Sequence, residues 1–289
     1  MSEDTVIYQN EQGGILRCSG QPPYVLATLD GLYGAGVYER ATVRAEGQQG
    51  ESVLGGSFAP RTLTLSLTVV GESRERLRSL CRNAAAVLSP ELSGVLSMDT
   101  PLGRRSLRVW PDSTPALSLK TECCAGLSVS LTAYEPLFLE ERERRVEMAA
   151  YSGRFRFPLG LGADWVFGER AGSRLTAVSN PGQAVCGLRA VFRADGTVRD
   201  PSLTAVGSGA VLTLRRDLLR GDTLEILSLP ARRRVELIRD GERRNVMGQL
   251  DPASEFPLLE PGENLLLCGA LEGEDRLRAE IFFQPVYTI

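Results

Sequence analysis

The strongest constraint on the fold is the stretch from Thr62 to Val69, in which apolar and hydroxyl residues alternate. Successive side chains of a β-strand point to opposite faces, so a period of two places every second residue on the same face. The residues on that face are Leu63, Leu65, Leu67 and Val69. The pattern therefore predicts a half-buried strand.

Two further stretches indicate strands in the first half of the chain. Residues 127–133 repeat the alternation, and residues 107–110 form a shorter version. Pro111 is expected to end that shorter strand, because proline has no N–H to donate to a neighbouring strand. The first half is therefore predicted to be mostly sheet.

Residues 72–88 predict a helix between these strands. Apolar residues recur there at helical spacing and form one stripe, which comprises Leu77, Leu80, Cys81, Ala84, Val87 and Leu88. Ser73 is placed to cap the start of the helix, and Ser89-Pro90 is expected to close it. The charged residues on the opposite side are interpreted as a solvated face rather than a binding patch.

The length of 289 residues exceeds the usual size of a single hydrophobic core, so we expect two domains. A charged run at 140–145 and a Gly/Pro-rich stretch at 156–162 indicate a boundary near residue 145. The first domain is then residues 1–145, with a helix at about 72–88. The second is residues 146–289, and an irregular junction precedes its regular strands.

Turn signals divide the second half into short strands, which is typical of an antiparallel β-sandwich. Residues 235–239 followed by Asp240-Gly241 predict a hairpin, because glycine supplies the positive φ that the turn requires. Residues 277–283 alternate and predict a final strand with Leu277, Ala279, Ile281 and Phe283 inward. The expected fold class is mainly β, with an α+β first domain.

The absence of histidine excludes several kinds of chemistry. It removes Ser-His-Asp and Cys-His catalysis and every His-ligated metal. The cysteines form no C-x-x-C pair, so we interpret them as core residues in a reducing compartment; they are Cys18, Cys81, Cys123, Cys124, Cys186 and Cys268. We expect no enzyme, no catalytic residues, no cofactor and no metal.

Charge and hydropathy exclude two classes of partner. A net charge of -3 provides no basic field for nucleic acid. No segment approaches the roughly 20 apolar residues that cross a bilayer, so we expect no membrane insertion. The start of the chain has neither a basic leader nor an apolar core, and we therefore expect no secretory signal.

The order of motifs along the chain resembles the siphophage distal tail protein family, also called siphovirus-type tail components. In the first half the similar stretches are residues 23–26, 29–31, 55–61, 88–90, 94–96 and 133–138. In the second half they are residues 180–182, 200–203, 218–222, 250–254 and 259–264. The sequence departs from the family's pattern at residues 183–188, which lack an expected proline, and little can be matched at 151–172.

This resemblance implies a structural role without catalysis at the tip of a phage tail. Family members form a ring, usually of six copies, that joins the tail tube protein to the hub, the tail-associated lysin and the receptor-binding proteins. The first domain makes the ring. The second is galectin-like or carbohydrate-binding-module-like, and either docks receptor-binding proteins or binds a host glycan. The chain would be made and assembled in the cytoplasm of the host bacterium and be located at the virion tail tip.

Residues 38–61 suit such a ring, because this polar segment is long for a hairpin turn. It is expected to form a projecting arm or inter-subunit strand, with a mobile surface loop as the alternative. Arg61, Phe58 and Tyr38 are the candidate assembly contacts. For Arg61 the alternative is a solvated side chain.

Two other functions remain open from the sequence. A carbohydrate-binding module would need an exposed aromatic platform, and Trp165, Tyr151, Tyr287 and Phe282 are its candidates, with packing as the alternative. A glycoside hydrolase would need a pair of carboxylates held on opposed strands. Glu225, Glu236 and Asp251 are the candidates for that pair.

Overall fold

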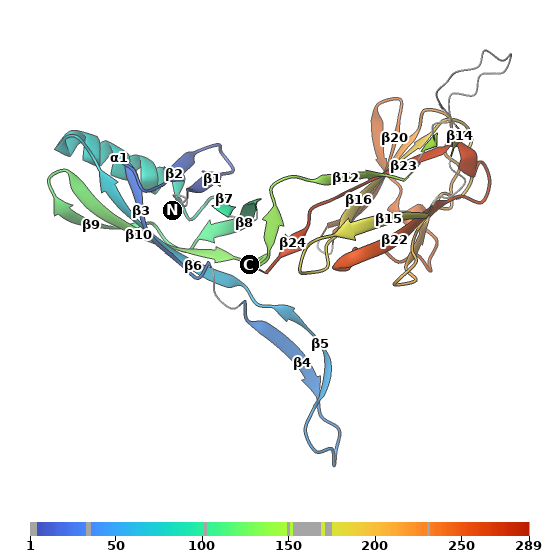
Figure 1. Cartoon of the computed structure of the whole chain (residues 1–289), viewed down its shortest axis with the longest axis horizontal. Helices are drawn as coiled ribbons and strands as arrows, with labels where there is room; N and C mark the ends of the chain where they lie inside the picture. The colour runs from blue at the N-terminus through green and yellow to red at the C-terminus, as the bar shows by residue number, and fades with distance from the viewer. Residues whose placement is uncertain are drawn as a thin grey trace, which may run out of the picture. The chain divides into compact units, whose positions relative to one another are not determined.

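The computed structural model describes residues 5–32, 36–100, 103–148, 151–152, 169–170, 175–229 and 232–288. Its internal contacts divide the chain into two compact units (Figure 1). The first comprises Met1–Glu141 together with Tyr287–Ile289, and the second comprises Arg142–Val286. The second unit is therefore inserted between two segments of the first.

The first unit consists of antiparallel strands and one helix in its described residues. Its strands are β1 (Val6–Asn10), β2 (Ile15–Cys18), β3 (Tyr24–Asp30), β4 (Tyr38–Val43), β5 (Ser52–Phe58), β6 (Arg61–Val70), β7 (Gly94–Thr100), β8 (Gly103–Pro111), β9 (Ala116–Thr121), β10 (Cys124–Ala133) and β11 (Phe138–Glu140), with β24 (Val286–Tyr287) pairing to β11. The main path runs β2-β1-β7-β8-β10-β6-β3, β9 adds to β10, and β4 and β5 form a separate pair.

β6 and β10 pair along their whole length, from Arg61 opposite Ala133 to Val70 opposite Cys124. Every second residue of both strands is buried, as the alternation predicts. Leucines and valines of the two strands stand directly opposite one another, for example Leu65 and Val129. This paired apolar face forms the centre of the first unit's core.

The predicted helix is confirmed as α1 (Arg74–Val87). Ser73 caps it, because its hydroxyl accepts a hydrogen bond from the Arg76 amide at 3.2 Å. The predicted apolar stripe is buried against β6, β10 and β2. Gly71 lies where β6 meets the helix, and a Cβ there would be 2.6 Å from the Leu77 nitrogen, so the close approach requires glycine.

The second unit is an antiparallel sandwich. Its strands are β12 (Arg144–Glu147), β13 (Tyr151–Ser152), β14 (Glu169–Arg170), β15 (Leu175–Asn180), β16 (Leu188–Ala194), β17 (Ser202–Ala205), β18 (Val211–Thr213), β19 (Thr223–Leu229), β20 (Arg232–Arg239), β21 (Glu242–Asn245), β22 (Gly262–Gly269) and β23 (Leu277–Phe283), with short 3-10 helices η1 (Met247–Gln249) and η2 (Glu274–Arg276). One sheet has the order β12-β23-β16-β19-β20-β21, and the other has the order β15-β22-β17-β18. The inward residues of both sheets share one apolar core.

The predicted hairpin joins β20 to β21, and both turn residues have positive φ, Asp240 at 52° and Gly241 at 82°. The predicted final strand is β23, with the expected inward residues buried. The fold-class prediction of a mainly β chain with a sandwich second domain is confirmed. Pro111 ends β8 as predicted: it is the last residue of the strand and pairs with Leu131, because a residue without an N–H can still stand where the ladder ends.

In the described residues no helix combines the length and hydropathy needed to span a bilayer. The Gly/Pro-rich stretch at 156–162 lies outside the described residues.

We expect Leu65→Ala to lower the free energy of unfolding by about 2–5 kcal/mol, because it leaves a cavity between β6, β10 and the helix. Thr62→Ala is the control, since Thr62 is exposed on the same strand. It should change stability by less than about 0.5 kcal/mol in urea unfolding. Equal losses in both variants would contradict a core centred on this ladder.

Asp222 is 3% exposed and makes an ion pair with Arg239, whose Nε donates to Oδ1 at 2.8 Å. The hydrogen bond from Arg239 holds the pKa of Asp222 below its usual value. A carboxyl group whose pKa is lower in the folded than in the unfolded chain stabilises the fold at pH values above its unfolded pKa. This contribution disappears as the pH falls below about 4.

Asp222→Asn should therefore lower the free energy of unfolding at neutral pH by about 1–3 kcal/mol. It should also reduce the loss of stability in acid, measured by calorimetry across pH. Asp195→Asn is the matched control, because Asp195 pairs with Arg278 at the surface, where such a pair contributes about 0–1 kcal/mol. An acid transition that is the same in wild type and Asp222→Asn would rule out this linkage.

Candidate assembly surface

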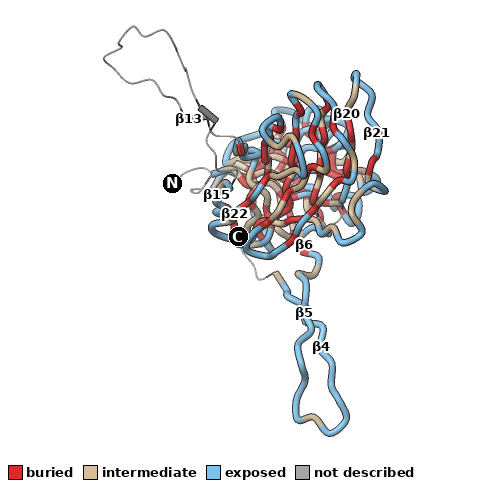
Figure 2. Tube along the Cα trace, turned by 90° about the vertical axis from the view of Figure 1, so that its right-hand side faces the viewer, coloured by how far each residue is buried: buried red, intermediate tan, exposed pale blue. Residues whose placement is uncertain are grey.

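β4 and β5 form a two-stranded hairpin that projects from the first unit (Figure 1). We call residues 37–58 the β4–β5 arm. All residues of both strands are exposed except the half-buried Phe58, and the arm is almost wholly pale blue in Figure 2. The polar segment predicted from sequence is thus a paired hairpin.

The base of the arm is held by an aromatic pair. The rings of Tyr38 and Phe58, directly opposite in the register, pack edge to face with centroids 5.1 Å apart. Arg40 lies over the Tyr38 ring at 5.5 Å. A Cβ at Gly56 would be 2.6 Å from that ring, so glycine makes room for it. Tyr38 and Phe58, both predicted as assembly contacts, therefore contact each other.

Gln48 organises the tip of the arm. Its carbonyl oxygens accept from Arg44 Nε at 3.3 Å and from the Ala45 amide at 3.0 Å, and its Nε2 donates to Ser52 Oγ at 2.9 Å. The rest of the arm, from Val37 just before β4 to the end of β5, carries apolar side chains on the surface. These are Val37, Val43, Val53 and Leu54, of which Leu54 is 72% exposed. A hairpin of this kind has no core of its own chain to bury them in.

Arg61 begins β6 at the base of the arm, and it is 6% exposed. Nη1 donates to the Leu32 carbonyl at 3.0 Å, and Nη2 donates to the Thr288 carbonyl at 3.0 Å. The guanidinium lies 4.9 Å from the centre of the Phe138 ring. Burial lowers the pKa of Arg61 below its usual value. Arg61 thus joins the end of the chain to the start of β6.

The expectation of a solvated Arg61 is wrong, because the guanidinium lies inside the first unit. The contact between subunits stays a prediction. One signal in the sequence was missed: the period of two, continued back from Leu63, places Arg61 on the inward face of the strand. There it stands opposite Ala133, which has a small side chain.

Two of the four aromatic residues predicted as a glycan platform, Tyr287 and Phe282, have contacts that the structure describes. Tyr287 packs against the first unit's core, with Arg105 3.7 Å above its ring and its hydroxyl donating to Glu140 at 3.1 Å. Phe282 is half-buried beneath Arg189, at 4.1 Å. Both residues therefore make packing contacts within the chain, and their role as a platform stays a prediction. Tyr151 lies in β13, and Trp165 lies outside the described residues.

Glu225 and Glu236 are directly opposite each other on β19 and β20. The sequence did not connect them, but both accept a hydrogen bond from Arg243 Nη1, at 2.8 and 3.0 Å. Asp251 instead pairs with Arg215. A hydrogen bond from the Ala253 amide and the Arg215 pair hold the pKa of Asp251 below its usual value, which is opposite to the shift of a catalytic acid. Each of these three carboxylates forms an ion pair with an arginine.

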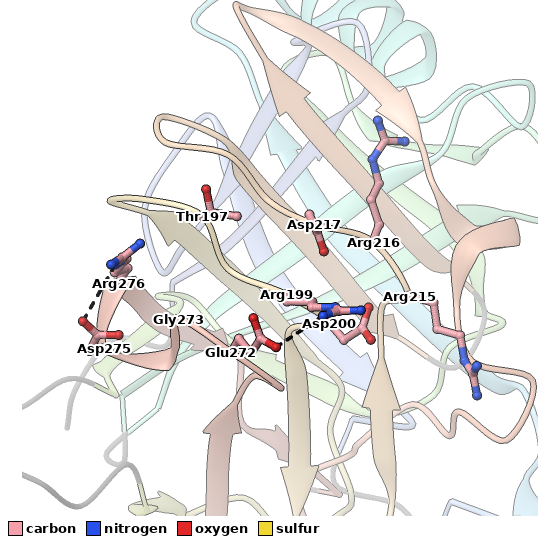
Figure 3. Close-up of a pocket in the computed structure, with 10 residues that line it drawn as sticks. All are labelled: Thr197, Arg199, Asp200, Arg215, Arg216, Asp217, Glu272, Gly273, Asp275 and Arg276. Atoms are coloured by element: carbon pink, nitrogen blue, oxygen red, sulfur yellow. Dashed lines mark hydrogen bonds and ion pairs between the residues drawn. The ribbon is translucent and has the colours of Figure 1, made fainter.

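A hollow of about 620 Å³ lies among loops of the second unit (Figure 3). Charged side chains dominate its lining, and Arg199 pairs with Glu272 across 3.2 Å. Arg215 and Arg216 bond to Asp251 and Gln249. None of the described lining residues is aromatic, so the hollow offers no platform for a sugar ring.

Another exposed apolar surface lies on the outer face of the sheet β15-β22-β17-β18. Leu175 of β15 pairs directly with Leu267 of β22. Leu265, also on β22, and Val211 on β18 are exposed as well.

The described residues contain no cluster of metal-ligating side chains. Among the cysteines, Cys123 is exposed, Cys124 is half-buried and the rest are buried free thiols.

Comparisons with known proteins give one family-model match and several similar solved structures. Residues 24–126 match the family model of the phage tail protein RIFT-related domain. The chain is similar to the crystal structure of phage SPP1 Dit (gp 19.1), described as a paradigm of the hub adsorption apparatus in phages that infect Gram-positive hosts. The TM-score is 0.68 at 13% identity, over 97% of this chain and 98% of that chain.

A chain of the phage P2 baseplate, in its activated conformation with Ca, is also similar, with a TM-score of 0.53 and 10% identity over 98% of each chain. No curated protein matched the sequence. Residues 24–126 are therefore similar to the phage tail protein RIFT-related domain, and the chain has, over nearly its whole length, the fold of SPP1 Dit, a siphophage distal tail protein.

Proposed function

We propose that this protein is a structural component of a phage tail tip that assembles into a ring, of six copies, between the tail tube and the hub. The observation that carries the proposal is the β4–β5 arm, which presents apolar side chains on a hairpin with no core beneath it. Exposed apolar surface of this kind marks a site of association.

The arm favours a ring over a two-fold dimer. It leaves the first unit at one place, and it is the only separate two-stranded sheet among that unit's described residues. A contact between two different surfaces of identical chains is heterologous, and such contacts close into rings when the rotation permits. Six copies is the number that the resemblance implies.

The proposed partners are other copies of this chain, the tail tube protein, the hub with its tail-associated lysin, and receptor-binding proteins. The proposed location is the virion tail tip, after synthesis in the host cytoplasm. No catalysis is needed for this role. The carboxylates that were candidates for hydrolysis are held in ion pairs, which supports a non-enzymatic function.

Native mass spectrometry and negative-stain images should reveal a closed ring, either of the purified chain alone or after addition of the hub protein of the same tail. Both conditions are needed because some ring-forming proteins associate only on their hub. A strict monomer in both conditions, at high protein concentration, would refute the proposal.

Leu54→Asp should prevent or weaken ring formation at least tenfold, because it places a charge on an apolar surface that becomes buried on assembly. Leu271→Asp is the matched control, since Leu271 is 65% exposed in the second unit, outside the arm. Circular dichroism should be unchanged for both variants. Rings that form equally well with Leu54→Asp would exclude the arm from assembly.

A further inference from the structure

β9 is an exposed edge strand with little protection along most of its length. All its residues are exposed, and within the described part of the chain it pairs only with β10. Its other edge therefore presents unpaired backbone N–H and C=O groups. Native proteins normally block such edges with charges, proline or bulges. Here the protection is confined to one end of the strand, where the single charged residue, Lys120, coincides with an irregularity in the register, and residues 116–119 pair regularly.

Two leucines make this edge apolar as well. Leu117 stands opposite Leu127, and Leu119 stands opposite Ala125, so both lie on the face that β10 buries in the core. Yet Leu117 is half exposed, and Leu119 is 77% exposed. The edge thus combines free hydrogen-bonding groups with an apolar flank, which is the combination that strand addition uses.

The register places β9 and the arm at opposite ends of the β6–β10 ladder. β9 pairs with the start of β10, where Cys124 faces Val70. The arm joins the other end, where Arg61 faces Ala133. Figure 1 shows the arm pointing away from β9. An arm that reaches a β9 edge must therefore come from another copy of the chain.

We propose that the outer edge of β9 receives the β4–β5 arm of the neighbouring copy as added strands, with Leu117 and Leu119 packed against the arm's apolar side chains. Among the described residues, β4 and β5 pair only with each other, so each has an edge available for a further strand. The strands also match in length, since β9 and β4 have 6 residues each. This inference rests on the proposed ring and names the surface that accepts the arm.

Cysteine cross-linking tests the contact directly. In a Cys123→Ser background, which removes the exposed thiol, Leu119→Cys is combined with Val43→Cys, Val53→Cys or Leu54→Cys. Under oxidising conditions at least one pair should give a ladder of covalent oligomers beyond the dimer, because each copy then carries both halves of a head-to-tail contact. Each single variant should stay monomeric on the denaturing gel.

The control pair is Leu271→Cys with Leu54→Cys, which should give no ladder, since Leu271 is equally accessible but lies in the second unit. Rings seen in images without a ladder from any of the three pairs would overturn the inference and leave the ring intact. Dimers from Leu119→Cys alone would overturn it too, because they indicate a two-fold contact between β9 edges. Absence of rings in every condition would overturn both the ring and this contact.

A second measurement does not depend on disulfide geometry. Leu119→Asp should weaken ring formation at least tenfold, as for Leu54→Asp, and the double variant should be little weaker than either single variant, because both remove the same contact. Losses that multiply in the double variant would indicate that the two residues serve separate interfaces.

Discussion

The pairing of β6 with β10 is the interaction on which the rest of the first unit depends. Two long strands place leucines and valines opposite one another on a single face, and this face is the one that the helix covers. Burial of such side chains contributes about 1.5–3 kcal/mol each, so an uninterrupted ladder of them fixes the register. A slip of one residue would turn the whole apolar set toward solvent.

The two ends of this ladder perform different tasks. At one end, Arg61 occupies the inward position that a leucine would otherwise fill, and it uses its donors to bind the carbonyl of Thr288 from the returning chain. At the other end, the ladder continues into the exposed β9 edge. The proposed arm and its proposed acceptor are therefore separated by the continuous β6–β10 ladder, which suits contacts that repeat identically around a ring.

The sandwich presents two chemically different faces. Its six-stranded sheet carries glutamates that share arginines, such as Glu225 and Glu236 around Arg243, which keeps that face hydrated and charge-balanced. Its four-stranded sheet exposes leucines such as Leu175 and Leu267. The alignment of β19 with β20 brings Glu225 and Glu236 next to each other. Residues on different strands become neighbours only when the strands align, and the periodicity of a sequence does not reveal that alignment.

The sequence alone determined the local elements: the β6 strand from its period of two, the helix from its stripe and its Ser73 cap, and the β20–β21 turn from Asp240-Gly241. These signals are local because they depend on steric preferences and on neighbours within a few residues. Only the tertiary structure decided that Arg61 is buried, that Tyr287 returns to the first unit, and that the arm and the β9 edge are left uncovered. Such features depend on which distant segments meet, and that is set by the packing of the whole chain.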